Sequence, residues 1–198
     1  MSGYGPDVAK ARADDLDRAA LAWVGEHVGS RVLDLGCGAG GQSQRLVAAG
    51  AEVSAIDIEN YTEAFADTAA HFIQGDIRDL ATLVTGPYDL CVLQRVIHYV
   101  PYTDALTLLQ TIRAFGVQCL YISATGIETD IGAGYPCAIA SVVDRYCALA
   151  PEVAETFSIH EPVCLYTPTE FGELLIAAGW NIEQLWVSAF GNSKAICT

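Results

Sequence analysis

The residues best suited to chemistry are three glycines and an acid that follow a short apolar segment. Residues 31–40 read Arg-Val-Leu-Asp-Leu-Gly-Cys-Gly-Ala-Gly, so Gly36, Gly38 and Gly40 come just after Asp34. Glycines let the backbone turn sharply and approach a ligand with no Cβ in the way. Asp34 adds a negative charge that a pyrophosphate site would not favour. The loop therefore suits a cationic ligand that carries an ammonium group.

Alternating strands and helices are expected to position this loop. We predict strands over 32–35, 52–56, 71–74, 88–93 and 119–123, and helices over 7–28, 42–49, 65–70, 104–114, 138–149 and 169–178. Such alternation is typical of an α/β protein with a parallel sheet and helices on both faces. Residues 181–188 and 194–197 form two further strands, too close for a helix between them, so they should pair antiparallel.

Length and charge limit the classes of function. The 198 residues suggest one domain spanning 1–198, and the formal charge is −14 with only ten lysines and arginines. Nucleic-acid binding needs clustered basic residues, so a nucleic-acid partner is not expected. No apolar run of about 18 residues indicates a membrane span, and no signal peptide is evident. We expect a cytoplasmic protein, a monomer or weak homodimer, without a membrane partner.

The cysteines and histidines give no metal-binding pattern. Seven cysteines include no Cys-x-x-Cys pair, and four histidines are dispersed along the chain. The odd cysteine count and this spacing indicate neither a disulfide framework nor a zinc site. The prediction is a chain without a metal.

Three further groups are predicted at the carboxyl ends of strands, where open parallel sheets bind ligands. Asp57 lies about 20 residues after the loop, where an acid can accept the hydroxyls of a ribose. Asp76 can accept a hydrogen bond from the exocyclic amine of adenine. Ile58 and Ile77 are placed to sandwich the base. The third group is the stretch 94–99, Gln-Arg-Val-Ile-His-Tyr.

With these residues the chain resembles the class I S-adenosylmethionine-dependent methyltransferases, in their small-molecule branch. The resemblance covers roughly residues 30–123 by motif, and the closing helix and strands by layout. It implies a Rossmann-like seven-stranded sheet with a reversed strand pair, and S-adenosyl-L-methionine as cofactor with S-adenosyl-L-homocysteine as product. The family pattern places Gly36, Cys37 and Gly38 on the methionine part, Asp57 on the ribose, Asp76 with Ile77 on the adenine, and Gln94 beside the sulfonium.

A nicotinamide dinucleotide is the alternative ligand, since Gly36, Gly38 and Gly41 satisfy G-x-G-x-x-G. That motif exposes a helix N-terminus to pyrophosphate, which Asp34 would repel. It also gives no reason for Asp76 at the third strand. We therefore disfavour it.

Candidates on the acceptor side come from several segments. His98 is the candidate general base by location and ordinary pKa, with a structural histidine at a helix start as the alternative. The candidate substrate-binding residues are Tyr4, Arg95, Arg145, His160 and Tyr166. For three of them a plainer interpretation remains open: a mobile terminus for Tyr4, a surface ion pair for Arg95 and a solvated helix charge for Arg145.

The predicted reaction is in-line methyl transfer to an oxygen or nitrogen of a small metabolite. An Asp or Asn-Pro-Pro-aromatic element, common where the family modifies nucleic-acid amines, is absent from Leu93-Gln94-Arg95-Val96. Residues 1–29, as a helical lid, and the insertion 124–168 should enclose the acceptor. Two alternatives stay open: a protein methyltransferase attracted by the acidic surface, and a catalytically silent cofactor-binding module.

Overall fold

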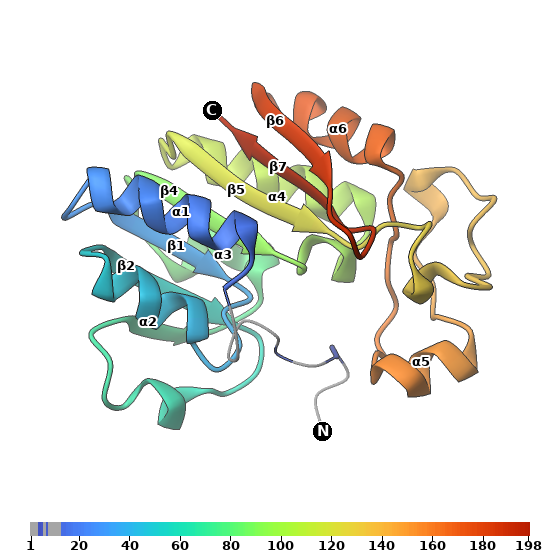
Figure 1. Cartoon of the computed structure of the whole chain (residues 1–198), viewed down its shortest axis with the longest axis horizontal. Helices are drawn as coiled ribbons and strands as arrows, with labels where there is room; N and C mark the ends of the chain where they lie inside the picture. Colours follow the sequence, from blue (N-terminus) through green and yellow to red (C-terminus); the bar gives the residue numbers. More distant parts are fainter. Residues whose placement is uncertain (1–3, 6, 8–12) are drawn as a thin grey trace. The chain divides into compact units, whose positions relative to one another are not determined.

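A seven-stranded sheet organises the chain, in the order β3-β2-β1-β4-β5-β7-β6 (Figure 1). The computed structural model describes residues 4, 5, 7 and 13–198. The strands are β1 Arg31–Leu35, β2 Glu52–Asp57, β3 His71–Gln74, β4 Leu90–Gln94, β5 Cys119–Ala124, β6 Ile182–Val187 and β7 Ser193–Cys197. Strand β1 pairs parallel with β2 and β4, and β2 pairs parallel with β3, whereas β6 and β7 are antiparallel. The predicted sheet, mostly parallel with a reversed closing pair, is confirmed.

Strand β1 lies between β2 and β4 and is buried from Val32 to Leu35. Val32, Leu33 and Leu35 are fully buried. Strands covered on both faces read as continuous apolar runs, and Leu90 and Leu93 give β4 the same character. The glycine loop follows directly from the carboxyl end of β1.

The helices are α1 Asp15–Glu26, α2 Gly41–Ala48, α3 Leu80–Leu83, α4 Tyr102–Ala114, α5 Pro151–Phe157 and α6 Pro168–Ala177. Two of them, α1 and α6, begin where side chains cap the free backbone N–H groups. Asp14 and Asp17 form a reciprocal capping box at α1, and Thr167 and Glu170 form another at α6. We had predicted that α1 starts at residue 7, but the Asp14 cap starts it at Asp15. Residues 8–12 of the predicted helix lie outside the described part.

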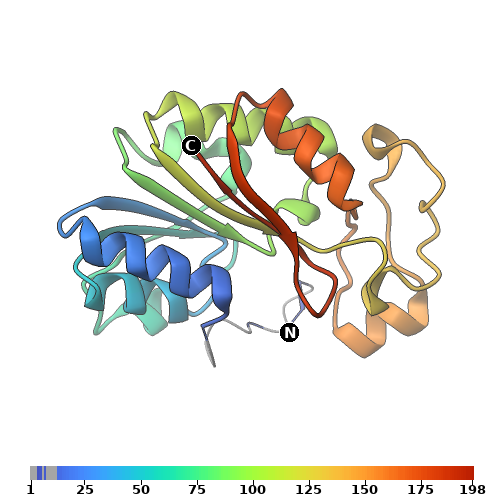
Figure 2. The same ribbon diagram turned by 45° about the horizontal axis from the view of Figure 1, so that its top comes forward.

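The chain divides into two compact units. The amino unit comprises residues 7–93 and 111–121, and the carboxyl unit comprises residues 1–6, 94–110 and 122–198. In the amino unit α1 contacts α2, and α2 packs against β2. In the carboxyl unit α6 packs along β6 of the closing hairpin (Figure 2).

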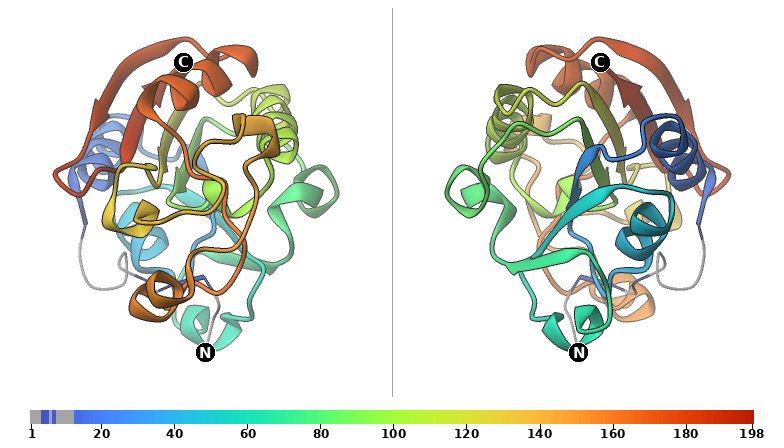
Figure 3. Two further views of the ribbon diagram at one scale, coloured as in Figure 1. Left: turned by 90° about the vertical axis from the view of Figure 1, so that its right-hand side faces the viewer. Right: turned by 90° about the vertical axis from the view of Figure 1, so that its left-hand side faces the viewer.

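Two predicted helices were wrong. Residues 65–70 are not an α-helix; Phe65 ends a 3-10 turn, Thr62–Phe65, and no helix follows it there. Residues 138–149 contain only a 3-10 turn, Val142–Asp144, and the helix of the insertion is α5, which Pro151 starts (Figure 3). Proline favours the first helical turn, where no N–H is needed, so it marks the start that the apolar pattern had misplaced.

A disulfide joins Cys137 to Cys147, with their Cα atoms 6.5 Å apart. The prediction that the cysteines form no disulfide was therefore wrong. Cys147 exchanges two backbone hydrogen bonds with Val163, of 3.1 and 2.9 Å, and this bridge brings the insertion back on itself. Sequence spacing carries no signal for that return, since the pairing depends on tertiary contacts.

Among the described residues, no helix combines the length and apolar character needed to cross a membrane. In the same part of the chain, no three side chains of histidine, cysteine, aspartate or glutamate gather in a group that could hold a metal ion.

Candidate functional site

The glycine loop between β1 and α2 adopts a backbone that other residues rarely accept. Gly36, Gly38 and Gly40 have φ angles of 69°, 53° and 80°, all in the left-handed region. A Cβ on Gly40 would lie 2.6 Å from the Phe65 ring, so that position excludes larger residues. The N–H groups of Gly36 and Cys37 both donate to Ile56 O, at 2.8 and 3.1 Å, which ties the loop to β2.

Asp57, the last residue of β2, contacts the loop directly. Its carboxylate accepts the backbone N–H of Gly38 at 2.9 Å and that of Glu59 at 3.0 Å. Burial raises the pKa of Asp57, the two backbone hydrogen bonds oppose this, and the charges of Glu59 and Asp7 add to the rise. The predicted ribose-binding acid therefore lies against the predicted methionine-binding loop.

Asp34 lies beneath the loop and is 4% exposed. Ser43 Oγ, in α2, donates a hydrogen bond to Asp34 Oδ2 at 2.5 Å. Burial raises the pKa of Asp34 to about 7; the Ser43 hydrogen bond lowers it, and the charges of Asp17 and Asp57 raise it. The negative charge predicted beside the loop is consequently only partly developed at neutral pH, and a nearby cation would favour it.

Sequence reasoning missed a third acid on this loop, Asp7. Its Oδ2 accepts the N–H of Ala39 at 2.9 Å and lies 2.6 Å from where a Cβ of Gly38 would stand. No motif singles out Asp7, because it reaches the loop from a segment 32 residues away in sequence. With Asp34 and Asp57 it makes the surroundings of the loop strongly acidic.

The predicted adenine-binding residues lie at the end of β3 and in the turn after β2. Asp76 accepts the backbone N–H of Arg78 and forms an ion pair with its guanidinium, at 2.5 Å, which lowers the pKa of Asp76. Ile77 is buried, whereas Ile58 is 44% exposed. An adenine amine would have to share the Asp76 carboxylate with Arg78.

Cys37 is buried, and burial raises the pKa of its thiol. A thiol that stays protonated is a weak nucleophile, so Cys37 acts in the loop as a small apolar side chain. Gln94 is the last residue of β4 and is half-buried.

His98 lies in a 3-10 turn, Ile97–Tyr99, of the carboxyl unit and is 2% exposed. Its Nε2 lies 3.2 Å from Thr125 Oγ1. Burial, with a smaller contribution from the positive charge of Arg95, lowers the pKa of His98 to about 3. The imidazole is neutral at physiological pH but has little affinity for a proton, which favours the structural interpretation over that of a general base.

Arg95, three residues earlier, has an unusual backbone. Its φ is 56°, which is uncommon for a residue with a side chain, and its N–H donates to both Ser123 O and Ser123 Oγ at 3.0 Å. Its Nε is buried and makes no hydrogen bond within the described part of the chain. The surface ion pair that we had considered does not occur there.

Tyr4 makes three contacts within the carboxyl unit. Its ring meets the edge of Tyr99 at a centroid distance of 5.1 Å, and the Tyr99 hydroxyl donates to Tyr4 O. Its backbone also forms an antiparallel bridge with Ile159. These contacts place Tyr4 against Tyr99, whose ring also contacts His98.

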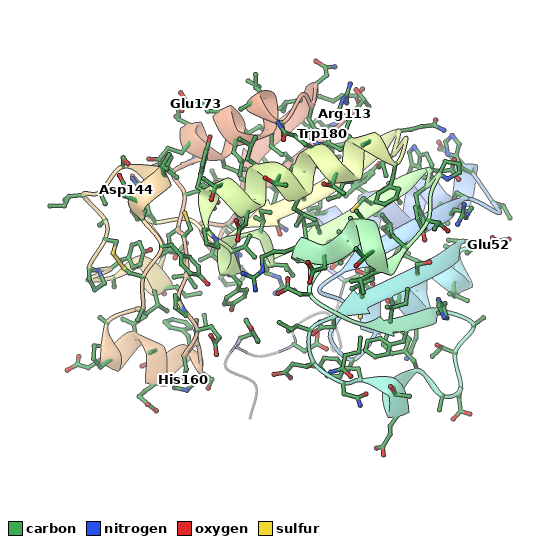
Figure 4. The ribbon with its side chains drawn as sticks, turned by 180° about the vertical axis from the view of Figure 1, so that it is seen from behind. Glu52, Arg113, Asp144, His160, Glu173 and Trp180 are labelled. Carbon is green, nitrogen blue, oxygen red and sulfur yellow. A yellow bond between two sulfur atoms is a disulfide. The ribbon has the colours of Figure 1, made fainter. Side chains whose placement is uncertain are left out.

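The remaining candidates, Arg145, Tyr166 and His160, differ in their burial and in their partners. Arg145 is 5% exposed, and its five N–H donors are all used: two go to Glu170, one to Leu165 O and two to Ala140 O. It can bind no substrate carboxylate, and it is no solvated helix charge either. Tyr166 is fully buried, and His160 is exposed on the surface after α5 (Figure 4).

The strand order, the reversed closing pair and the acidic glycine loop after β1 together define the class I methyltransferase fold. Residues 32–115 match the family described as "Methyltransferase domain". The ubiquinone biosynthesis O-methyltransferase of Burkholderia multivorans is 31% identical over 99 residues, which cover 44% of this chain and 42% of that protein. The match thus spans less than half of that relative.

Solved structures share the whole fold. The 1,6-didemethyltoxoflavin-N1-methyltransferase of Burkholderia thailandensis, solved with S-adenosylhomocysteine, has a TM-score of 0.66 at 17% identity, over 92% of this chain and 77% of that one. The magnesium protoporphyrin IX methyltransferase of Synechocystis PCC 6803 has a TM-score of 0.64 at 16% identity, over 98% and 90%. Residues 32–115 of the chain therefore match a methyltransferase family, and the chain as a whole has the fold of these solved methyltransferase structures.

Proposed function

We propose that this protein transfers a methyl group from S-adenosyl-L-methionine to an oxygen or nitrogen of a small molecule. The observation that carries the proposal is the glycine loop after β1, which Asp34, Asp57 and Asp7 surround with negative charge. The match of residues 32–115 to a methyltransferase family supports the same cofactor. The matched ubiquinone biosynthesis O-methyltransferase and the structurally similar 1,6-didemethyltoxoflavin-N1-methyltransferase support a small acceptor.

The loop residues fit the cationic end of this cofactor. The left-handed glycines leave the backbone bare, and the Gly38 and Ala39 N–H groups already bind carboxylates, so the loop can bind an anionic group as well. The carboxylates around it repel one another, which favours a bound ammonium or sulfonium. Asp57 would accept the ribose hydroxyls, Asp76 and Ile77 with Ile58 would contact the adenine, and Gln94 would lie beside the sulfonium.

The cofactor supplies an activated methyl group: the acceptor atom attacks in line, the new bond forms as the carbon–sulfur bond breaks, and sulfur keeps the electron pair of that bond. The chain's part is to orient the acceptor and exclude water. A hydroxyl or protonated amine must also lose a proton. Because the pKa of His98 is about 3, we assign this proton to solvent or to a phosphate buffer rather than to the imidazole.

A small acceptor also agrees with the charge of the chain. A formal charge of −14 disfavours a nucleic acid. A basic protein as acceptor, and a silent cofactor-binding module, are the alternatives, and turnover with small molecules distinguishes them from the proposal. The cytoplasmic location, the monomeric or weakly dimeric state and the lid of residues 1–29 and 124–168 stay predictions.

Calorimetry with S-adenosylhomocysteine tests the proposal. Asp57→Ala should weaken binding about 100-fold or more, because it removes charged hydrogen bonds to the ribose and the support of Gly38. Asp67→Ala is the matched control: it removes the same charge from an exposed position, and it should bind within twofold of the wild type. Absence of heat with the wild type at high protein concentration would refute the proposal.

A further inference from the structure

We propose that the methyl acceptor carries a carboxylate and that the Arg95 guanidinium binds it. The proposal rests on the methyltransferase function proposed above and adds the chemical class of the acceptor. In this proposal Arg95 determines specificity for the acceptor, and His98 and Tyr99 are its neighbours in the acceptor site.

The backbone of Arg95 is the first argument. A φ of 56° costs free energy for a side chain other than glycine or asparagine. Such conformations persist where the surroundings impose them, and they concentrate at binding and catalytic sites. Here Ser123 imposes it, since its carbonyl and hydroxyl oxygens both accept the Arg95 N–H. The strained residue, Arg95, directly follows the carboxyl end of β4, and such folds bind ligands at this edge of the sheet.

The guanidinium of Arg95 is the second argument. Its Nε is buried without a hydrogen bond, and no ion pair joins it to a carboxylate in the part of the chain that the structure describes. A buried donor without a partner is costly. Arg145 of the same unit shows the contrast, because all five of its donors are used and Glu170 neutralises it. The paired N–H donors of the Arg95 guanidinium therefore suit a planar, bidentate anion such as a carboxylate.

Charge balance is the third argument. With 24 acidic and ten basic residues, the protein repels a free carboxylate unless a dedicated cation attracts it. The positive charge of Arg95 already acts on its neighbours, since it lowers the pKa of His98 and opposes the rise in the pKa of Tyr99. No acidic side chain contributes beside Arg95 to these two pKa shifts. An anionic ligand would supply the missing negative charge.

Paired acceptors test this inference. A library of hydroxy- and amino-substituted carboxylates, each with its primary carboxamide, is incubated with the full chain and labelled S-adenosylmethionine. We expect methylated products from carboxylates, with kcat/KM at least tenfold above the matched amides. Methylation of amides alone, equal use of both members of a pair, or no methylation of any carboxylate would each overturn the inference.

Variants at Arg95 complete the test. Arg95→Asn keeps a residue that tolerates the left-handed backbone, and Arg95→Lys keeps the charge without the fork. Arg95→Asn should raise KM for the best carboxylate about 100-fold and remove its advantage over the amide, with kcat changed less than threefold. Arg95→Lys should recover part of that advantage. The control Arg113→Asn, exposed on α4, should match the wild type; a carboxylate preference that survives in Arg95→Asn would overturn the inference.

Binding of S-adenosylhomocysteine separates this proposal from the one it rests on. Wild type and Arg95→Asn should bind it equally in calorimetry. If the wild type does not bind, the proposed function fails; if both bind and the carboxylate preference is absent, only the assignment of Arg95 fails.

Discussion

Replacing Asp34 by asparagine should stabilise the free protein while it weakens cofactor binding. The folded protein holds the Asp34 carboxyl with a pKa of about 7, against 3.8 for an exposed one. Between those values the native state binds more protons than the unfolded chain, so stability is full below about pH 4 and falls as pH rises through 7. At about 1.4 kcal/mol per pKa unit, the loss amounts to about 4 kcal/mol by pH 8.

Asparagine does not ionise and keeps an oxygen that can accept the Ser43 hydroxyl, so the variant escapes this loss. Urea unfolding of both proteins at pH 4 and pH 8 measures the effect. The difference in unfolding free energy, variant minus wild type, should rise by about 4 kcal/mol from pH 4 to pH 8. The same variant should bind S-adenosylhomocysteine more weakly, because a charge that favours the ammonium group is lost. A difference that stays constant with pH would refute the argument, since it would mean that Asp34 ionises freely in the folded protein.

Two further predictions concern the carboxyl unit. His98→Ala should leave kcat within threefold at saturating acceptor, and the pH profile unchanged between 6 and 8, because the imidazole is already neutral there; a hundredfold loss of kcat would restore it as a general base. The same variant should lose about 2 kcal/mol of stability from the cavity and the unpaired Thr125 hydroxyl. Arg145→Met should cost about 3 kcal/mol in urea unfolding, because it leaves the Glu170 carboxylate and two carbonyls without their donor, and a loss below 1 kcal/mol would contradict that role.

The sheet could be predicted from the sequence because apolar runs and glycines record it locally. Strand β1 is an apolar run that ends at the glycine loop, and the short gap after β6 dictates an antiparallel return. The insertion was predicted poorly for the opposite reason. Its structure depends on Arg145 meeting Glu170, and on Cys147 meeting Val163, across 25 and 16 residues of chain with no periodic pattern.

The candidate site divides in the same way. Asp34 and Asp57 could be found because their distance from the glycines is set by the strands that carry them. Asp7 could not be found, since it approaches from a distant segment. Arg95 and Arg145 looked alike in sequence, and only the structure separates a guanidinium with all donors used from one with a buried, unpaired Nε.

The acids around the glycine loop are better explained by ligand binding than by stability. Burial alone would keep Asp34 protonated, and its hydrogen bond with Ser43 only partly offsets that cost. Asp57 faces the same penalty, increased by the nearby charge of Asp7. A fold selected only for stability would place neutral side chains at these positions, because unrelieved repulsion between neighbouring carboxylates is unfavourable. A cation bound at the loop removes the repulsion in one step, so the free energy stored there becomes part of the affinity for that cation and is absent for a neutral or anionic competitor.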